Sequence, residues 1–402
     1  MTWHLPHDAT ERERHSALRA AVLADELAPL TDAFDRAGRF PLEHYQRLHE
    51  AGYLRQAIPI DHGGDGASLF EVVLAQEQLG RASVALGIGA AMSFNLIGRL
   101  VEDPGVWPAE VVARVLESLA RDGGLVNSVV TEAALGSISR GGLPETTATP
   151  VSGGWRIDGH KIFVTAAPAL RWLVTAVRLP PRDGAPQGEL ARALVEAPTP
   201  GLRFEATWGD ALSQRSGGSD DAFFKDVFVP DHLVVERQVV GERNLPPPPN
   251  GWWLSLVAVY LGCAQAAVYA AADHAHHRVP SVLGQPLASQ ASVQQKIGRL
   301  QTLVDAARAL LYDTARRWTQ QPAQRATLGA AIASTKYHVT HAACEVTAQA
   351  LDIAGGFSLT RNLPLERYFR DARGGLYQPL QDDLALQAIG RQALARRVAI
   401  PT

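Results

Sequence analysis

Residues 155–165 have the sequence WRIDGHKIFVT, in which apolar and polar residues alternate around Gly159. Alternation with a period of two is typical of a half-buried strand, and the glycine favours a turn, so we expect a β-hairpin here. Further strand-like stretches follow at residues 172–177, 191–195 and 222–230. The last ends at Pro230, where a missing N–H does least harm to a strand. Six or more short strands in about 110 residues indicate a small barrel or sandwich.

Helical periodicity flanks this β region on both sides. Before it, Leu18, Val22, Leu23 and Leu27 recur on one helical stripe. After it, a run of prolines at 246–249 forms a stiff connector to helical stretches at 251–277, 290–318, 323–354 and 382–398. Their number and length are those of an antiparallel four-helix bundle. We therefore predict an α+β multidomain fold, with an N-terminal α-helical domain (1–123), a middle β domain (124–238) and a C-terminal four-helix bundle (239–402).

The composition limits the classes of partner. The 402 residues carry 38 Lys and Arg against 41 Asp and Glu, a formal charge of −3, so no excess charge favours nucleic acid or an anionic membrane. Residues 252–272 are apolar and long enough to cross a bilayer, but they are rich in alanine and continue into an amphipathic segment. We expect a buried helix, and no membrane association.

The first residues lack the apolar core of a secretory signal, and the chain has only two cysteines, Cys263 and Cys344, in alanine-rich helical patterns. A cytoplasmic location and two small buried thiols are the expectation. The Rossmann fingerprint, the phosphate loop and the HExxH pair are all missing from the sequence. His274, His276 and His277 cluster at one helix end without a ligand partner at a recognised spacing, so no metal site is predicted.

Two motifs point to a flavin. Residues 130–137 have the sequence VTEAALGS, and residues 159–165 have the sequence GHKIFVT. The pair resembles the TEPxxGSD and GxKx(W/F)(I/V)T motifs of the acyl-CoA dehydrogenase superfamily. The resemblance covers essentially the whole chain and implies an FAD cofactor, with Val130, Thr131, Ser137, Phe163 and Thr165 in contact with flavin or substrate. An aromatic ring can cover a flavin face, and a threonine can reach its polar edge. Ordinary strand core is the alternative for Phe163.

The remaining motifs lie nearer the C-terminus. Residues 209–219, followed by FFKDVFVP, resemble the segment that closes the family's β domain and also suit a glycine-rich turn. Arg278 ends the first helix of the last domain; the resemblance implies that it meets the cofactor pyrophosphate, and the alternative is a charge that complements the helix dipole. The resemblance implies that the backbone at Gly355 and Gly356 approaches the cofactor closely. In the family, this contact usually comes from a neighbouring subunit. Asp352 stands where the family has a glutamine.

The expected catalytic base is missing. The family's usual glutamate position, nine residues after Arg370, holds Pro379, and the alternative position, ten residues before Gly262, holds Trp252. Asp382 and Asp383 are the nearest carboxylates, but they begin a helix, where capping alone explains an aspartate. The segment RGGLYQPLQDD (373–383) resembles a branch grouped with reduced-flavin monooxygenases. The catalytic residue therefore stays open.

The leading functional expectation is an FAD-dependent oxidoreductase that desaturates an acyl-CoA or related acyl substrate, with hydride transfer to flavin N5. The alternative is a monooxygenase that uses reduced flavin and O₂ through a flavin C4a-peroxide, and a third class is a non-catalytic ligand-binding protein. The partners would be the small-molecule substrate and either an electron-transfer partner or O₂. Long apolar bundle helices also predict a homodimer or homotetramer.

Overall fold

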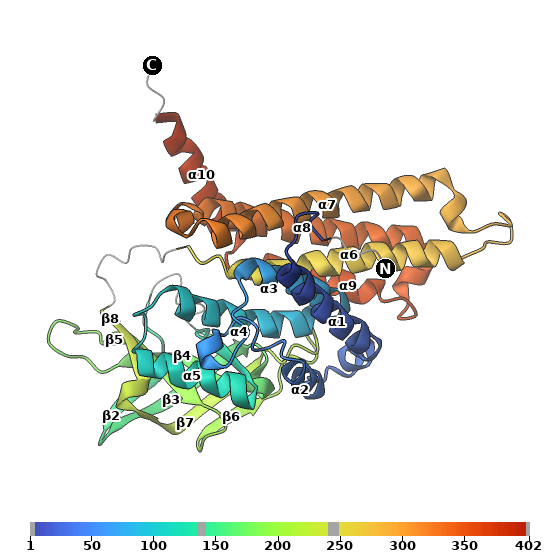
Figure 1. Cartoon of the computed structure of the whole chain (residues 1–402). Coiled ribbons are helices and arrows are strands. Elements are labelled where there is room, and N and C mark those ends of the chain that lie inside the picture. Colours follow the sequence, from blue (N-terminus) through green and yellow to red (C-terminus); the bar gives the residue numbers. More distant parts are fainter. Residues whose placement is uncertain (1–4, 135–141, 240–248, 399–402) are drawn as a thin grey trace.

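The computed structural model describes residues 5–134, 142–239 and 249–398. Along the chain, a helical region is followed by a β region and then by a second helical region (Figure 1). The N-terminal helices are α1 (Glu11–Ala37), α2 (Leu42–Glu50), α3 (Leu69–Ala82), α4 (Val84–Glu102) and α5 (Ala109–Asp122). The strands are β1 (Leu125–Val129), β2 (Thr147–Val151), β3 (Gly154–Val164), β4 (Leu170–Leu179), β5 (Glu189–Glu196), β6 (Leu202–Glu205), β7 (Asp220–Pro230) and β8 (Val234–Val239). The C-terminal helices are α6 (Trp253–His277), α7 (Ala291–Gln320), α8 (Gly329–Ala354), α9 (Leu365–Arg373) and α10 (Asp382–Val398). The predicted fold class, helical then β then helical, is confirmed.

Local sequence sets the helix ends in the first region. Thr10 caps α1 and Ser68 caps α3, each in a capping box with the glutamate three residues later. At its other end α1 stops at Gly38, which adopts a left-handed conformation with φ 57°. These caps leave few unsatisfied backbone groups where the helices meet the rest of the molecule.

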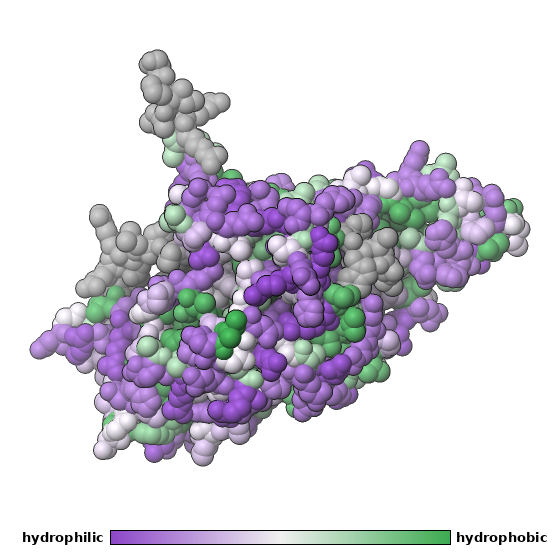
Figure 2. Space-filling model, viewed as in Figure 1, coloured by the Kyte–Doolittle hydropathy of each residue, from purple (hydrophilic) through white to green (hydrophobic). Residues whose placement is uncertain are grey.

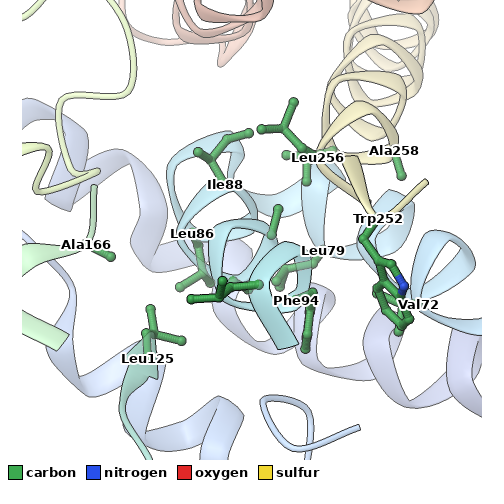
Figure 3. Close-up of a cluster of buried hydrophobic side chains, with 14 of the residues drawn as sticks. Val72, Leu79, Leu86, Ile88, Phe94, Leu125, Ala166, Trp252, Leu256 and Ala258 are labelled. Atoms are coloured by element: carbon green, nitrogen blue, oxygen red, sulfur yellow. The ribbon is translucent and has the colours of Figure 1, made fainter. Parts of the chain in front are cut away.

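Close backbone contact joins the N-terminal helices to the C-terminal ones. A Cβ atom on Gly80 of α3 would lie 2.3 Å from the Val259 carbonyl oxygen, and one on Gly262 of α6 would lie 2.1 Å from the Glu77 carbonyl oxygen. Glycine at both positions lets α3 and α6 touch along their backbones. Figure 3 shows the resulting core, in which side chains of α3, α4, α6 and β1 pack together. The first and last regions therefore share one hydrophobic core.

The strands of the described residues form one eight-stranded sheet. Its order is β6-β7-β3-β2-β4-β5-β8, and β1 pairs in parallel with β4. The hairpin predicted inside residues 155–165 is wrong, because this stretch is the single strand β3. The turn lies earlier, at residues 152–153, between β2 and β3. Gly159 marks a bulge in β3, where a Cβ atom would lie 2.4 Å from Thr146 Oγ1, so the glycine serves packing and not a turn.

The fourth predicted bundle helix extends beyond the other helices. Residues 382–398 form α10, but this helix projects away from the bundle (Figure 1) and leaves Leu386 and Leu394 exposed. The short helix α9 packs against α6 and α8, and α10 also contacts α8. Two buried arginines of α9, Arg367 and Arg370, pair with Asp32 and Asp35 of α1. The predicted C-terminal bundle of helices is therefore confirmed, and its last helix meets α8 near its start before it extends beyond the other helices.

In the part of the chain that the structure describes, two helices, α4 and α6, are long and apolar enough to cross a membrane by length and composition. Of the most apolar stretch of each helix, 78% is buried inside the molecule in α4 and 89% in α6. Such burial is typical of core helices in a folded domain. The face drawn in Figure 2 is largely hydrophilic, with hydrophobic residues scattered across it. Cys263 and Cys344 are both buried and free, as predicted.

Candidate active site

A buried ion pair ties the two flavin-type motifs together. Lys161 Nζ donates to Glu132 Oε1 at 2.6 Å, and both side chains are buried. The same carboxylate accepts hydrogen bonds from Thr146 Oγ1 at 2.7 Å and from the Glu145 backbone N–H at 2.6 Å. Burial raises the pKa of Glu132, but the hydrogen bonds from Lys161 and Thr146 outweigh it and hold the pKa below its usual range. Glu132 is therefore a structural anchor and a poor base.

This anchor sets the end of β1 beside the bulged end of β3. The Ile162 N–H donates to the Thr131 carbonyl oxygen at 3.0 Å. The next residue, Phe163, has a positive φ of 58° and its side chain is 58% exposed. Its ring meets Trp208 edge-on, with centroids 5.7 Å apart. Phe163 is thus not strand core: the backbone turns its ring outward at a conformational cost, as is often seen at functional sites.

Thr165 continues the same surface. Its Oγ1 lies 3.1 Å from Ser219 Oγ, and its carbonyl oxygen accepts from Asn127 Nδ2 at 3.2 Å. The structure therefore brings Thr131, Phe163 and Thr165 together, next to the segment 209–219. Val130 is half-buried at the same strand end, and Ser137 lies outside the described residues.

A second group of polar residues joins the loop between β6 and β7 to helices α6 and α9. Gln214, with a positive φ of 55°, donates from Nε2 to the Tyr260 hydroxyl at 3.0 Å. Its backbone N–H donates to Asp371 Oδ1 at 2.6 Å. A Cβ atom on Gly374 would lie 2.1 Å from Gln214 Nε2, so a larger residue there would displace the Gln214 side chain. Sequence reasoning missed this group, although the Gly374-Gly375 pair directly after RDAR signals a close contact.

Burial dominates the acid–base properties of this group. It raises the pKa of Asp371 to about 6, against the opposing effect of Arg367. It also raises the pKa of the Tyr260 hydroxyl, while hydrogen bonds with Gln214 and Gln378 lower it. Tyr260 is fully buried and stays protonated at neutral pH, so it can donate a hydrogen bond and not accept a proton.

The other predicted cofactor residues lie far from this surface. The guanidinium of Arg278, at the end of α6, lies 5.1 Å from the centroid of the Phe357 ring. Phe357 directly follows Gly355 and Gly356, which are both exposed. Asp352 is exposed at the end of α8. Arg278 follows Tyr260 by 18 residues, which is about 27 Å along a helix. Figure 1 shows this end of the bundle far from the sheet. The predicted cofactor residues of one chain therefore form two separate groups, one around Phe163 and one around Arg278.

The four candidate catalytic positions hold Pro379, Trp252 and the two aspartates at the start of α10. Pro379 is exposed, and Trp252 is 3% exposed, with its ring 2.0 Å from where a Cβ atom on Gly98 would lie. Asp382 Oδ1 accepts from Lys336 Nζ at 2.9 Å, and its Oδ2 lies 2.7 Å from His341 Nε2. Burial raises the pKa of Asp382, but these two hydrogen bonds lower it below its usual range.

The pairing of Asp382 anchors the start of α10 to α8. Asp383, the second candidate, is exposed. Among the described residues, no group of three or more His, Cys, Asp or Glu side chains could hold a metal ion. In the histidine cluster at the end of α6, the His274 ring lies 5.5 Å from the Phe357 ring.

Comparisons with known proteins agree with this architecture. The sequence matches the family model "Acyl-CoA dehydrogenase, N-terminal domain" over residues 10–136 and the model "Acyl-CoA dehydrogenase, C-terminal domain" over residues 254–378. YdbM of Bacillus subtilis (strain 168), named as a candidate acyl-CoA dehydrogenase, is 33% identical over 383 residues, which cover 95% of this chain and 97% of the relative. The chain therefore belongs to the acyl-CoA dehydrogenase family, and it is an oxidoreductase of that family, as its motifs predicted.

Two solved structures share the fold over nearly the full length. Butyryl-CoA dehydrogenase from Megasphaera elsdenii is 22% identical, with a TM-score of 0.82, and the match covers 97% of this chain and 100% of that one. KijD3, solved with FMN and dTDP-3-amino-2,3,6-trideoxy-4-keto-3-methyl-D-glucose, is 24% identical, with a TM-score of 0.83, and the match covers 98% of this chain and 96% of that one. The same fold thus accommodates both a CoA-ester enzyme and a protein with a nucleotide-sugar ligand.

Proposed function

We propose that this chain is an FAD-dependent oxidoreductase that acts on an acyl-CoA or related acyl thioester. The observation that carries the proposal is the outward ring of Phe163, 58% exposed and held in a strained backbone conformation beside Thr131 and Thr165. An exposed aromatic face flanked by threonines fits a flat cofactor that has one apolar face and a polar edge. Bound flavin would supply the two-electron acceptor for α,β-dehydrogenation.

A flavin cofactor agrees with family membership, and the residues around Arg278 at the far end of α6 favour FAD over FMN. Arg278 offers forked donors for a pyrophosphate, the Phe357 ring offers a stacking face, and Gly355 and Gly356 leave room for a close approach, since a Cβ atom on either would meet nothing within 4 Å. The residues around Arg278 lie about 27 Å along α6 from Tyr260, which is beside the surface around Phe163. The residues around Arg278 and those around Phe163 therefore contact the same cofactor only if they come from two copies of the chain. We therefore propose a homodimer or homotetramer with shared sites.

Dehydrogenation of a thioester needs a base for the α-proton. We propose no residue for it, because Asp382 is paired with Lys336 and His341 and Glu132 with Lys161. The test is to load the protein with FAD, mix it anaerobically with acyl-CoAs of increasing chain length, and follow the flavin absorbance. Bleaching with one class of acyl-CoA supports the proposal, and a flavin that stays oxidised with all of them refutes it.

One observation favours a second candidate, a monooxygenase that uses reduced flavin and O₂. Both positions at which the family carries its catalytic glutamate hold residues without a carboxylate, Pro379 and Trp252. A reaction that begins with O₂ does not need that base, and water exclusion becomes the main task of the residues around the site. This candidate requires that oxygen from ¹⁸O₂ enter an organic substrate when the reduced protein is oxidised. Stoichiometric hydrogen peroxide with every substrate tried would exclude it.

We also propose that the protein works in the cytoplasm, since both of its cysteines are free and buried. Fractionation of the source cells with an antibody against the chain would test this location. Recovery of the protein outside the cytoplasm would refute it.

A further inference from the structure

Arg192 of β5 is a half-buried cation that pairs with no carboxylate. Its side chain makes no hydrogen bond or ion pair with any residue that the structure describes, although its Nη1 atom is buried. Arg19 and Arg171 also have one buried nitrogen without a hydrogen-bond partner, but their guanidinium groups pair with Asp65 and Glu196. A charge held away from water without a partner is costly, so its presence calls for a functional explanation.

The carboxylate that acts most strongly on Arg192 is already bonded to other groups. This carboxylate is Glu236 of β8, which accepts from Arg99 Nη2 at 3.0 Å and from Trp107 Nε1 at 2.7 Å. Burial lowers the pKa of Arg192, the Glu236 charge opposes this effect, and the Arg99 charge adds to it. Glu236 therefore does not neutralise Arg192.

The buried pair of Lys161 and Glu132 does not supply a free carboxylate either. Burial lowers the pKa of Lys161, Glu132 raises it, and the Arg192 charge lowers it further, so Arg192 is close enough to repel Lys161. Glu132 is bonded to Lys161 itself. Three cations, Arg99, Lys161 and Arg192, thus surround two carboxylates, and the excess positive charge lies on Arg192.

The strand register adds a further cation on the same face of the sheet. Arg192 lies opposite Ala176 of β4, and Arg178 follows two residues later on β4, so the two arginines share one face. Arg178 is exposed, and its side chain makes no ion pair with any described residue. At the other end of β4 the same face is apolar and covered, since Trp172 Nε1 donates to Ser118 Oγ of α5 at 2.8 Å. The face therefore becomes cationic and open to solvent toward Arg178.

The first flavin motif lies two strands away from Arg192. β1 pairs in parallel with β4, and Val129 lies opposite Thr175. Continued by one residue, this register brings Val130 to the level of Arg192, with β4 between them, so their backbones are about 10 Å apart. Phe163 lies on the other side of β1, where the ends of β1 and β3 meet. Arg192 is therefore placed to meet a part of the ligand remote from the flavin.

We propose that Arg192, together with Arg178, binds a phosphate group on the carrier arm of the thioester substrate. The inference rests on the proposed function, which makes the substrate an acyl thioester. Guanidinium groups bind phosphate through paired donors, and a phosphate supplies the negative charge that the cluster around Arg192 lacks. The carrier arm suits this position better than the acyl chain does, because Arg178 is open to solvent and Phe163 lies beyond both β4 and β1.

The test measures binding to the full-length, flavin-loaded protein by titration calorimetry. The probes are three thioethers, S-butyl-CoA, S-butyl-phosphopantetheine and S-butyl-pantetheine, which cannot react as thioesters do. Only the last has no phosphate. We expect Arg192→Met to weaken the binding of S-butyl-CoA by about tenfold or more and to leave that of S-butyl-pantetheine unchanged. A loss with S-butyl-phosphopantetheine as well assigns the phosphate next to the pantetheine, and its absence assigns a phosphate of the nucleotide; both results support the proposal.

Matched variants separate phosphate binding from a general effect on the fold. Arg178→Met should weaken the same ligands as Arg192→Met, by a smaller factor because this side chain is exposed. The control is Arg171→Met, which removes another half-buried arginine, from β4, and should leave the affinities for all three probes unchanged. No loss in Arg192→Met, or an equal loss with all three probes, would overturn the proposal.

Stability gives a readout that a structural role would move in the opposite direction. Because Arg192 pairs with no carboxylate, Arg192→Met should unfold at the same temperature as the parent protein or at a higher one. A lower unfolding temperature together with an equal loss for all three probes would show that Arg192 is structural. Failure of the proposed function looks different: acyl-CoAs would not bleach the flavin, although the binding of S-butyl-CoA would still depend on Arg192.

Discussion

Lys161 Nζ and Glu132 Oε1 lie 2.6 Å apart in the interior, and this contact holds the two motifs of the candidate site in register. The side chains are 0% and 2% exposed, so neither charge has water as an alternative partner. A buried charge that loses its partner is costly, because its desolvation is no longer offset. The pair therefore acts as a single structural unit.

We expect Lys161→Ala to lower the free energy of unfolding by about 3–5 kcal/mol, since it leaves the Glu132 carboxylate buried beside only neutral donors. Arg299→Ala is the control, because it breaks an exposed pair with Glu345 and should cost less than about 1 kcal/mol. Denaturant titrations of the two variants and the parent protein give the comparison. Similar small losses of unfolding free energy in both variants would show that the buried pair contributes no more to stability than the exposed pair does.

Asp371 makes stability depend on pH in an unusual direction. Its pKa of about 6 in the folded protein lies above the value of about 3.9 for an unperturbed aspartate, so the folded state binds this proton more tightly. The stabilising contribution of the protonated group is complete below about pH 4 and is lost as the pH rises to about 6.

Asp371→Asn removes this titration while keeping an acceptor for the Gln214 N–H. We expect the stability of the parent protein relative to Asp371→Asn to fall by up to about 3 kcal/mol between pH 4 and pH 7. Unfolding of both proteins at half-unit steps of pH measures the difference. A difference that is flat, or that grows with pH, would mean that Asp371 keeps an ordinary or lowered pKa when folded.

The sequence predicted features that depend on local pattern and missed those that depend on distant pairing. The strand-rich middle region and the three long C-terminal helices were predicted from the periodicity of apolar residues, and the structure contains both. The bulge at Gly159 was missed, because Gly159 packs against Thr146, the residue before the neighbouring strand β2. The Gln214–Tyr260 hydrogen bond and the Lys336–Asp382 ion pair each join residues 46 positions apart, and no local pattern marks them. The motif pair at 130–137 and 159–165 could be found because its members are held together by their own Glu132 and Lys161.

Phe163 offers a test that separates a cofactor contact from a packing role. Because its ring is 58% exposed, Phe163→Ala should change the stability of the flavin-free protein by no more than about 0.5 kcal/mol. If the ring covers the flavin, the variant should bind flavin up to about tenfold more weakly. Fluorescence titration of the flavin-free protein with FAD gives the affinity, and Phe228→Ala, which removes another partly exposed ring from β7, should leave it unchanged. Equal affinities for both variants would remove Phe163 from the flavin site.

The distance between Phe163 and Arg278 leads to a prediction about assembly. If each cofactor bridges two copies, every site combines Phe163 of one chain with Arg278 of the other. Phe163→Ala and Arg278→Ala proteins should each bind FAD weakly alone, but a mixed dimer has one site that lacks both residues and one site that keeps both. After subunit exchange at equal amounts, half of the dimers are mixed, so about a quarter of the sites should regain the parent affinity. Phe163→Ala mixed with Thr165→Ala is the control, because both residues belong to the same chain's half of the site and no intact site can form. Recovery in the first mixture alone would establish shared sites, whereas no recovery after exchange verified by mass would show that Arg278 and Phe163 do not meet one cofactor across two chains.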